Sequence, residues 1–211
     1  VSVRSKSVCC AKALLLPDKL EQAIMLRKLL LGIGPWFVFS MVLRFGSLEL
    51  INLAWISFFL LQTWFGWTYL KAGNPLSWMS TIVFSALFLN SYFQYSYYGI
   101  VYAAPICYGL FAITALLTVL VGKPFTLTHA RLHTPSEYWE HPIFMTINRH
   151  IALFWCAGFA FNGLVMLAEH QFPWLSLACT YCSLACVIVL SDKYPNYYRS
   201  QAMAKMATAQ S

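Results

Sequence analysis

The sequence predicts an all-α integral membrane protein: a bundle of about six transmembrane helices, a short N-terminal surface helix and a structured loop between helices 4 and 5. Three observations support this fold class. Hydrophobic residues make up 60% of the 211 residues and charged residues only 10%, whereas about a quarter of a soluble domain is charged. Several long stretches contain no charged residue, and the basic residues fall mainly between them on alternate sides.

Uncharged stretches define the expected spans, because a helix needs about 20 residues to cross the hydrocarbon core and a charge inside the core is costly. The longest stretch, 72–122, must hold two spans, which the tyrosine-rich segment 91–98 separates. Gly73-Asn74-Pro75 is typical of a turn that opens the first, and Pro124 is a stop signal after the second. The expected spans are 29–43, 50–70, 76–90, 99–121, 151–168 and 172–191.

This division gives the chain three parts. Residues 1–28 form a cytoplasmic segment with an amphipathic surface helix, 29–191 form the transmembrane domain with its loop 122–150, and 192–211 form a cytoplasmic tail. The tail is expected to be loose from Ala202 onward, because its residues there are small and polar.

The positions of the basic residues predict the orientation. With six spans, every one of the 14 Lys and Arg residues except Arg44 falls on the same side of the membrane. Cytoplasmic loops are enriched in Lys and Arg, so both termini are expected to be cytoplasmic. The net charge of +7 is then matched by anionic lipid head groups, and no nucleic acid is expected as a partner.

Polar residues inside the expected spans are few, and none of them is Asp, Glu, Lys or Arg. They are Asn52, Gln62, Asn90 and Asn162. The lack of an ionisable group argues against an ion-coupled carrier or a proton pump. Pro105 either breaks the fourth helix and creates a substrate site there or only kinks it, the commoner outcome in membrane helices.

Three cysteines of the last expected span, Cys179, Cys182 and Cys186, share one helical face. The Cys-x-x-Cys spacing of the first two suits redox chemistry or a soft metal. The favoured alternative is that these thiols are small apolar groups buried at a helix-packing seam. Seven cysteines, most of them within spans, require no disulfide framework.

The loop 122–150 contains the clearest local signals. Helical turns are expected over 125–133, and Thr134-Pro135-Ser136-Glu137 is a capping box that predicts a second short helix from Thr134. His141-Pro142 marks the next boundary, and Arg131 and Glu137 can approach each other across the bend. The residues expected to form an interaction surface are Lys123, Phe125, Arg131, Glu137, Tyr138, Trp139 and Arg149.

Histidines of this loop are the candidate metal ligands. His129 and His133 are four residues apart, a spacing that a metal site on a helix uses, and His141 lies close downstream with Glu137 and Glu140. One histidine pair with scattered acids is fewer ligands than a di-iron oxygenase needs. A structural role beside head groups or backbone carbonyls is therefore favoured, and no cofactor is predicted.

A resemblance to a known family rests on residues of the loop, the fifth expected span and the C-terminal segment. These residues are Val121-Gly122-Lys123-Pro124-Phe125-Thr126, Ala130-Arg131, Pro135-Ser136-Glu137-Tyr138-Trp139, Pro142, Phe144, Asn148, Trp155 and Tyr194-Pro195-Asn196-Tyr197-Tyr198-Arg199. The pattern resembles small polytopic bacterial membrane proteins of the intracellular septation protein A type. The resemblance implies an inner-membrane location and association with envelope or division processes, without a particular reaction. His129 and His133 depart from the family pattern, which argues against a shared metal site.

Three classes of function remain. The favoured class is a non-catalytic inner-membrane protein that serves as an accessory or assembly component beside other membrane proteins. The second is a transporter or channel for a small neutral or lipid-like solute, marked by a wet cavity beside Pro105, Asn90 and Asn162. The third is a metal- or thiol-dependent membrane enzyme, marked by metal at His129 and His133 or by a reactive cysteine pair.

Overall fold

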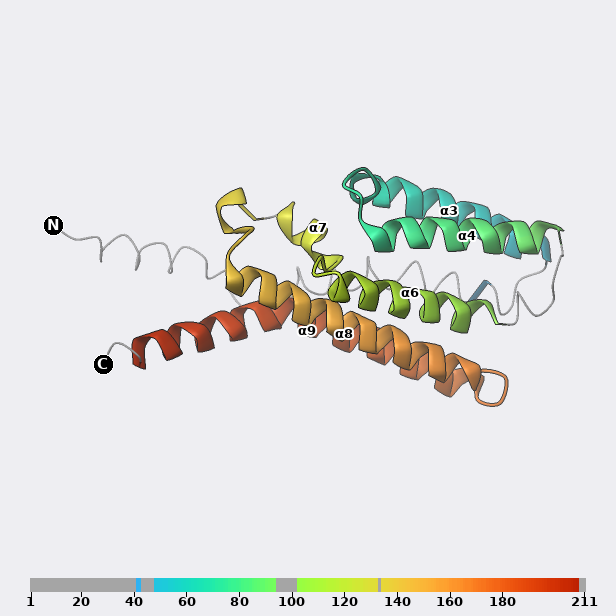
Figure 1. The fold of residues 1–211 in the computed structure, drawn as a ribbon. Helices are drawn as coiled ribbons and strands as arrows, with labels where there is room; N and C mark the ends of the chain where they lie inside the picture. The colour runs from blue at the N-terminus through green and yellow to red at the C-terminus, as the bar shows by residue number, and fades with distance from the viewer. Residues whose placement is uncertain (1–40, 43–47, 94–101, 133, 209–211) are drawn as a thin grey trace, which may run out of the picture.

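The computed structural model describes residues 41–42, 48–93, 102–132 and 134–208, and every regular element in these ranges is helical (Figure 1). The all-α prediction is therefore confirmed for the described residues. The elements are α3 (Leu48–Lys71), α4 (Pro75–Phe93), α6 (Ala103–Leu120), α7 (Thr126–Arg131), the 3-10 helix η1 (Ser136–Tyr138), α8 (Pro142–Leu167) and α9 (Pro173–Thr208).

Three of these helices have the length and composition to cross a membrane: α6, α8 and the Pro173–Gln201 part of α9. The apolar part of α4, Pro75–Asn90, is shorter. At 1.5 Å per residue, the 18 residues of α6 extend about 27 Å, close to the thickness of the hydrocarbon core. The first expected span, 29–43, lies outside the described residues apart from 41–42, so the count of six spans stays a prediction.

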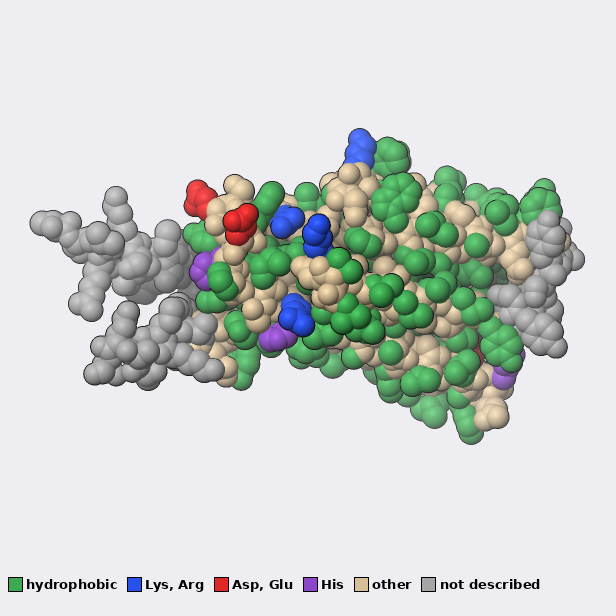
Figure 2. Space-filling model, in the orientation of Figure 1, with side chains coloured by type: hydrophobic (Ala, Val, Ile, Leu, Met, Phe, Trp, Pro, Cys, Tyr) green, Lys and Arg blue, Asp and Glu red, His purple; other side chains and the backbone are tan. Residues whose placement is uncertain are grey.

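Large apolar side chains cover much of the surface of these helices. Trp64 is 79% exposed, and Leu120 and Leu164 are each 69% exposed. Figure 2 shows apolar side chains over most of one face, with most of its charged side chains toward the end that carries α7 and η1. Exposed apolar surface of this extent would be costly in water, and it is compatible with lipid contact.

The turn between α3 and α4 lies where Gly73-Asn74-Pro75 predicts it. Gly73 has a φ of 71°, a left-handed conformation that ends helices and that glycine adopts without a steric penalty. The side-chain oxygen of buried Asn74 accepts hydrogen bonds from the N–H groups of Leu76 (3.0 Å) and Ser77 (3.3 Å). Asn74 therefore caps the N-terminus of α4.

The main core lies where α3, α4, α6 and α8 meet. Phe84 of α4 is 1% exposed, and its ring centroid lies 5.0 Å from that of Phe58 on α3. On the other side, the ring of Phe159 on α8 lies 5.6 Å from that of Phe111 on α6. These residues belong to one hydrophobic cluster, so the α3–α4 hairpin and the α6–α8 pair share a core.

Small residues let α8 approach both of its neighbours closely. A Cβ atom placed on Gly158 would lie 2.8 Å from Cγ2 of Val187 on α9. A Cβ atom placed on Gly163 would lie 3.7 Å from the carbonyl oxygen of Pro105 on α6. Close approach at small residues is typical of helices that pack within a membrane.

Pro105 lies in the first turn of α6, which has Tyr102 as its N-cap. The N–H groups of a first turn have no partner inside the helix, so the missing N–H of a proline is tolerated there. Within the described residues α6 continues through Pro105 to Leu120, and residues 99–101 of the fourth expected span lie outside them, so the substrate site at Pro105 stays a prediction.

The helix α9 continues through Pro195 to Thr208, so the prediction of a loose tail from Ala202 is wrong over 202–208. Contacts with α8 hold the region around the proline. The hydroxyl of Tyr194 lies 2.6 Å from Nδ1 of His150, and the Tyr194 ring contacts Phe154 at 5.1 Å between centroids. Farther along, the alanine, methionine, lysine and glutamine residues of the segment are strong helix formers.

Candidate functional site

The segment after α6 is attached to the helical bundle at its start. Gly122, with a φ of 77°, ends α6, and the N–H of Lys123 donates to the carbonyl of Thr118 at 2.9 Å. The N–H of Phe125 donates to the Thr118 hydroxyl at 3.2 Å, and the Phe125 side chain is buried. The loop therefore begins with a residue whose side chain is buried and whose backbone is hydrogen-bonded to α6.

Two hydrogen bonds connect this start to other helices. The amide nitrogen of Asn74 donates to the carbonyl of Phe125 at 3.1 Å, across 51 residues of sequence. The hydroxyl of Thr126 donates to the carbonyl of Asn148 on α8 at 2.8 Å. Because all of these groups are buried, the bonds position α7 against both α4 and α8.

Arg131 contacts Trp139 instead of Glu137. The guanidinium carbon of Arg131 lies 5.2 Å from the centroid of the Trp139 ring, which is a cation–π contact. The indole N–H of Trp139 donates to the carbonyl of Thr134 at 2.9 Å. Among the described residues no ion pair joins Arg131 to Glu137, so the predicted approach of these two is replaced by stacking on the tryptophan.

The predicted capping box at Thr134 does not form. The short element there is the 3-10 helix η1, which begins at Ser136 with Pro135 as its N-cap and has no side-chain cap hydrogen bond. The carbonyl of Thr134 instead accepts from Trp139, which fixes the bend in another way. The boundary predicted at His141-Pro142 is confirmed, because α8 begins at Pro142 and Nδ1 of His141 accepts from the N–H of Ile143 at 3.2 Å.

The described histidines of the loop have structural contacts. The ring of His129 stacks on Tyr69 of α3 at 5.3 Å between centroids, and His141 caps α8. His133 lies outside the described residues. Within the described ranges, no group of three or more His, Cys, Asp and Glu side chains is arranged to hold a metal ion.

The cysteine face of α9 differs from the favoured prediction of a buried seam. Cys182 and Cys186 are exposed and Cys179 is half-buried. Among the described residues, Val187 of α9 packs against Gly158 of α8, and the thiols of Cys182 and Cys186 are not covered by α8. Cys156 of α8 does lie at a packing seam, where its thiol donates to the carbonyl of Ala112 at 3.4 Å.

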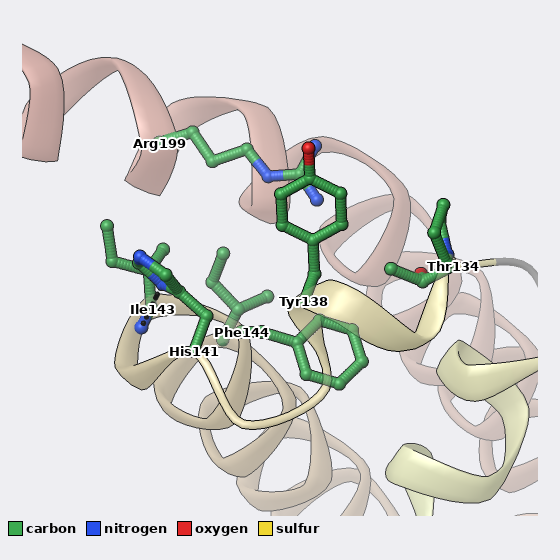
Figure 3. Close-up of a pocket in the computed structure, with 8 residues that line it drawn as sticks. Thr134, Tyr138, His141, Ile143, Phe144 and Arg199 are labelled. Atoms are coloured by element: carbon green, nitrogen blue, oxygen red, sulfur yellow. Dashed lines mark hydrogen bonds between the residues drawn. The ribbon is translucent and has the colours of Figure 1, made fainter.

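A pocket of about 600 Å³ opens beside the first turn of α8 (Figure 3). It lies between the loop and the part of α9 beyond Pro195. The described residues that line it are Thr134, Pro135, Tyr138, His141, Ile143, Phe144, Ile147 and Arg199. The sequence indicates Tyr138 and His141 as candidates but does not indicate the pocket, because Arg199 is 58 residues from His141 and no local pattern connects them.

The predicted interaction residues occupy different environments. Lys123, Arg131, Glu137, Tyr138 and Arg149 are exposed, Trp139 is half-buried and Phe125 is buried. The charged residues of this set are therefore exposed, whereas the Phe125 and Trp139 side chains are buried or half-buried. Comparison of the chain with protein-family models, with curated proteins and with solved structures gives no match. The fold and the site define a helical protein with three helices, among the described residues, that are long and apolar enough to cross a membrane, and with an ordered polar segment at one end.

Proposed function

We propose that this chain is a non-catalytic, multi-pass protein of the bacterial inner membrane that serves as an accessory or assembly component of a larger membrane complex. In this proposal it has six spans and cytoplasmic termini, and it docks on other membrane proteins through the loop 122–150. The resemblance to the intracellular septation protein A type supports the location and an association with envelope processes.

The observation that carries the docking proposal is the attachment of the loop to the bundle. Asn74 and Thr118 bind Phe125, and Thr126 binds Asn148, all through buried hydrogen bonds. A surface ordered in advance loses little conformational entropy on binding, so it suits a permanent partner. The charged and aromatic residues exposed on it supply polar contacts for such a partner.

The same hydrogen bonds support the orientation. The bond from Asn74 to Phe125 brings the α3–α4 turn beside the end of α6, so Lys71 and Lys123 lie at one end of the bundle. The antiparallel course of α8 and α9 puts Arg149 and Arg199 toward that end too (Figure 1). A basic end is the cytoplasmic end by the positive-inside rule, with anionic head groups as its counterpart.

Cysteine labelling tests the orientation. Single cysteines at Ser136 and Ala202 in a cysteine-free chain are expected to stay unlabelled when an impermeant thiol reagent is added outside intact cells. A cysteine at Ser96 is expected to react and serves as the positive control. Labelling of Ser136 in intact cells would contradict the proposed orientation.

Site-specific photocrosslinking tests the docking surface. A photoreactive amino acid placed at Glu137 or Arg149, both exposed, is expected to give discrete adducts with the same membrane protein in native membranes. Gln171, exposed in the turn between α8 and α9 at the other end, is the matched control position and is expected to give none of these adducts. Equal adducts from all three positions, or none from the loop, would argue against docking there.

One observation favours the second candidate, a channel or carrier for a small neutral solute. Asn162 of α8 is fully buried, and within the described residues neither atom of its side-chain amide has a hydrogen-bond partner. A buried amide is normally satisfied by protein or by water, as it would be in a wet passage. Faster glycerol-driven swelling of liposomes that contain the protein, lost in Asn162→Leu, would favour this candidate.

A further inference from the structure

The pocket beside α8 has two chemically different sides. Ile143, Phe144 and Ile147 line one side with apolar groups, and Phe144 and Ile147 are themselves largely buried. Tyr138, His141 and Arg199 contribute polar groups to the same pocket. An occupant that matches both sides must carry a polar group and an apolar group next to each other, as an amphiphile does.

The polar side is cationic. Arg199 is exposed, and in the part of the chain that the structure describes it has no carboxylate partner. None of the described residues that line the pocket is acidic. Arg199 on α9 and Tyr138 on η1 both line the pocket, and Figure 3 shows the Arg199 side chain extending from α9 over the pocket toward the side on which Tyr138 lies. This arrangement is complementary to an anion, and the planar guanidinium is suited to binding phosphate.

His141 adds a hydrogen-bond donor. Its Nδ1 accepts from the backbone N–H of Ile143, which leaves the proton of the neutral ring on Nε2. Tyr138 of η1, Arg199 of α9 and His141, the N-cap of α8, all line the pocket, and each carries a hydrogen-bond donor. The N-terminal end of α8 lies beside them, and its dipole also favours an anion.

The position of the pocket along the helices indicates the membrane depth of an occupant. Ile147 lies four residues before the expected span 151–168, which is about 6 Å along a helix and so within the head-group layer. Arg199 lies eight residues beyond Ser191, about 12 Å along α9, from where its long side chain extends back toward the pocket. This step rests on the proposed membrane arrangement.

We infer that the pocket binds the head group of an anionic phospholipid. The phosphate lies against Arg199, Tyr138 and His141, and the glycerol and upper acyl chain lie against Ile143, Phe144 and Ile147. A volume of about 600 Å³ is within the usual range for small-molecule sites. The lipid would thereby join the loop, α8 and the C-terminal part of α9, three parts of the chain that are distant in sequence.

Native mass spectrometry and thermal unfolding of the purified full chain in a neutral detergent test this inference. Titration with dioleoylphosphatidylglycerol is expected to give one retained lipid and a rise in unfolding temperature, whereas dioleoylphosphatidylcholine gives neither. Inorganic phosphate and sn-glycerol 3-phosphate are expected to give no shift, because they lack the apolar part. If either soluble phosphate reproduces the effect of the lipid, the site binds a free phosphate compound and the inference is wrong.

Variants connect the lipid to the pocket. Arg199→Gln is expected to weaken phosphatidylglycerol binding about tenfold, since a charge-assisted hydrogen bond is lost. Arg199→Lys keeps the charge without the planar guanidinium. Its affinity for phosphatidylglycerol is expected to lie between those of the parent chain and Arg199→Gln. Arg149→Gln, which removes an exposed charge outside the pocket, is the matched control and is expected to change binding less than about twofold.

Other outcomes separate this inference from the proposed function. Equal losses in Arg199→Gln and Arg149→Gln would show diffuse attraction to the basic surface and would overturn the pocket assignment. Labelling of Ser136 from outside would contradict the orientation and leave the lipid titration interpretable, because that titration uses purified protein.

Discussion

Gly158 of α8 lies directly against Val187 of α9, with only 2.8 Å between Cγ2 of the valine and the place where a Cβ atom on the glycine would be. Both residues are buried. A separation this short means that any side chain at Gly158 forces the two helices apart or moves Val187. The contact thus sets the distance between α8 and α9, the helices that contribute His141 and Arg199 to the pocket.

Gly158→Ala is therefore expected to lower the free energy of unfolding by about 1 to 3 kcal/mol, the usual cost of overpacking. Denaturant unfolding in detergent micelles measures the change. Gly163→Ala is the matched control, because a Cβ atom there meets its nearest neighbours only at 3.6 to 3.7 Å, an ordinary contact distance. Val187→Ala combined with Gly158→Ala should recover part of the loss. An equal loss in both glycine variants would contradict this explanation.

Asn74 is expected to be the most sensitive polar residue of the α3–α4 turn. Asn74→Ala removes the cap of α4 and leaves the buried carbonyl of Phe125 without its donor, for a combined loss of about 2 to 4 kcal/mol. Asn74→Ser keeps a capping oxygen and loses the amide donor, so it should cost about 1 kcal/mol less. Unfolding of the two variants in parallel checks the difference, and equal losses would show that the cap contributes nothing.

The buried side-chain amide of Asn162 is expected to lower the free energy of unfolding of the helical bundle. Its buried amide lacks a partner among the described residues, and Asn162→Leu replaces it with an apolar side chain of similar size. Removing an unsatisfied buried polar group should raise the free energy of unfolding by about 1 to 3 kcal/mol. A loss of stability in Asn162→Leu would instead show that the amide has a bound partner such as water.

The histidines of the loop are expected to hold no metal. Elemental analysis of the purified protein should find no stoichiometric transition metal, because His129 stacks on Tyr69 and His141 caps α8. The double variant His129→Gln, His133→Gln should therefore match the parent chain in its metal content. One equivalent of iron or zinc that is present in the parent and lost in the double variant would favour a metal-dependent enzyme.

Local sequence signals predicted the helices and two of their boundaries. Uncharged apolar stretches predicted helices, because a chain in lipid must satisfy its backbone hydrogen bonds internally. A helix does this within one segment, so the apolar pattern alone is enough to predict it. Gly73-Asn74-Pro75 and His141-Pro142 ended or began helices where expected, since each signal acts within one turn of backbone. The capping box predicted at Thr134 does not form. The indole N–H of Trp139 donates to the Thr134 carbonyl instead, so the position of an aromatic ring overrides a short hydrogen-bonding motif.

The sequence by itself determined that this chain is helical, apolar and basic overall, because these properties follow from composition and from neighbours within a few residues. Only the tertiary structure decided which distant groups meet. Asn74 reaches Phe125 and Arg199 joins His141 at a pocket through packing of helices that are separate in sequence, and Arg131 contacts Trp139 across the bend of the loop. Side-chain hydrogen bonds and cation–π contacts act over a few ångströms, so the choice of partner depends on the arrangement of the helices rather than on spacing along the chain.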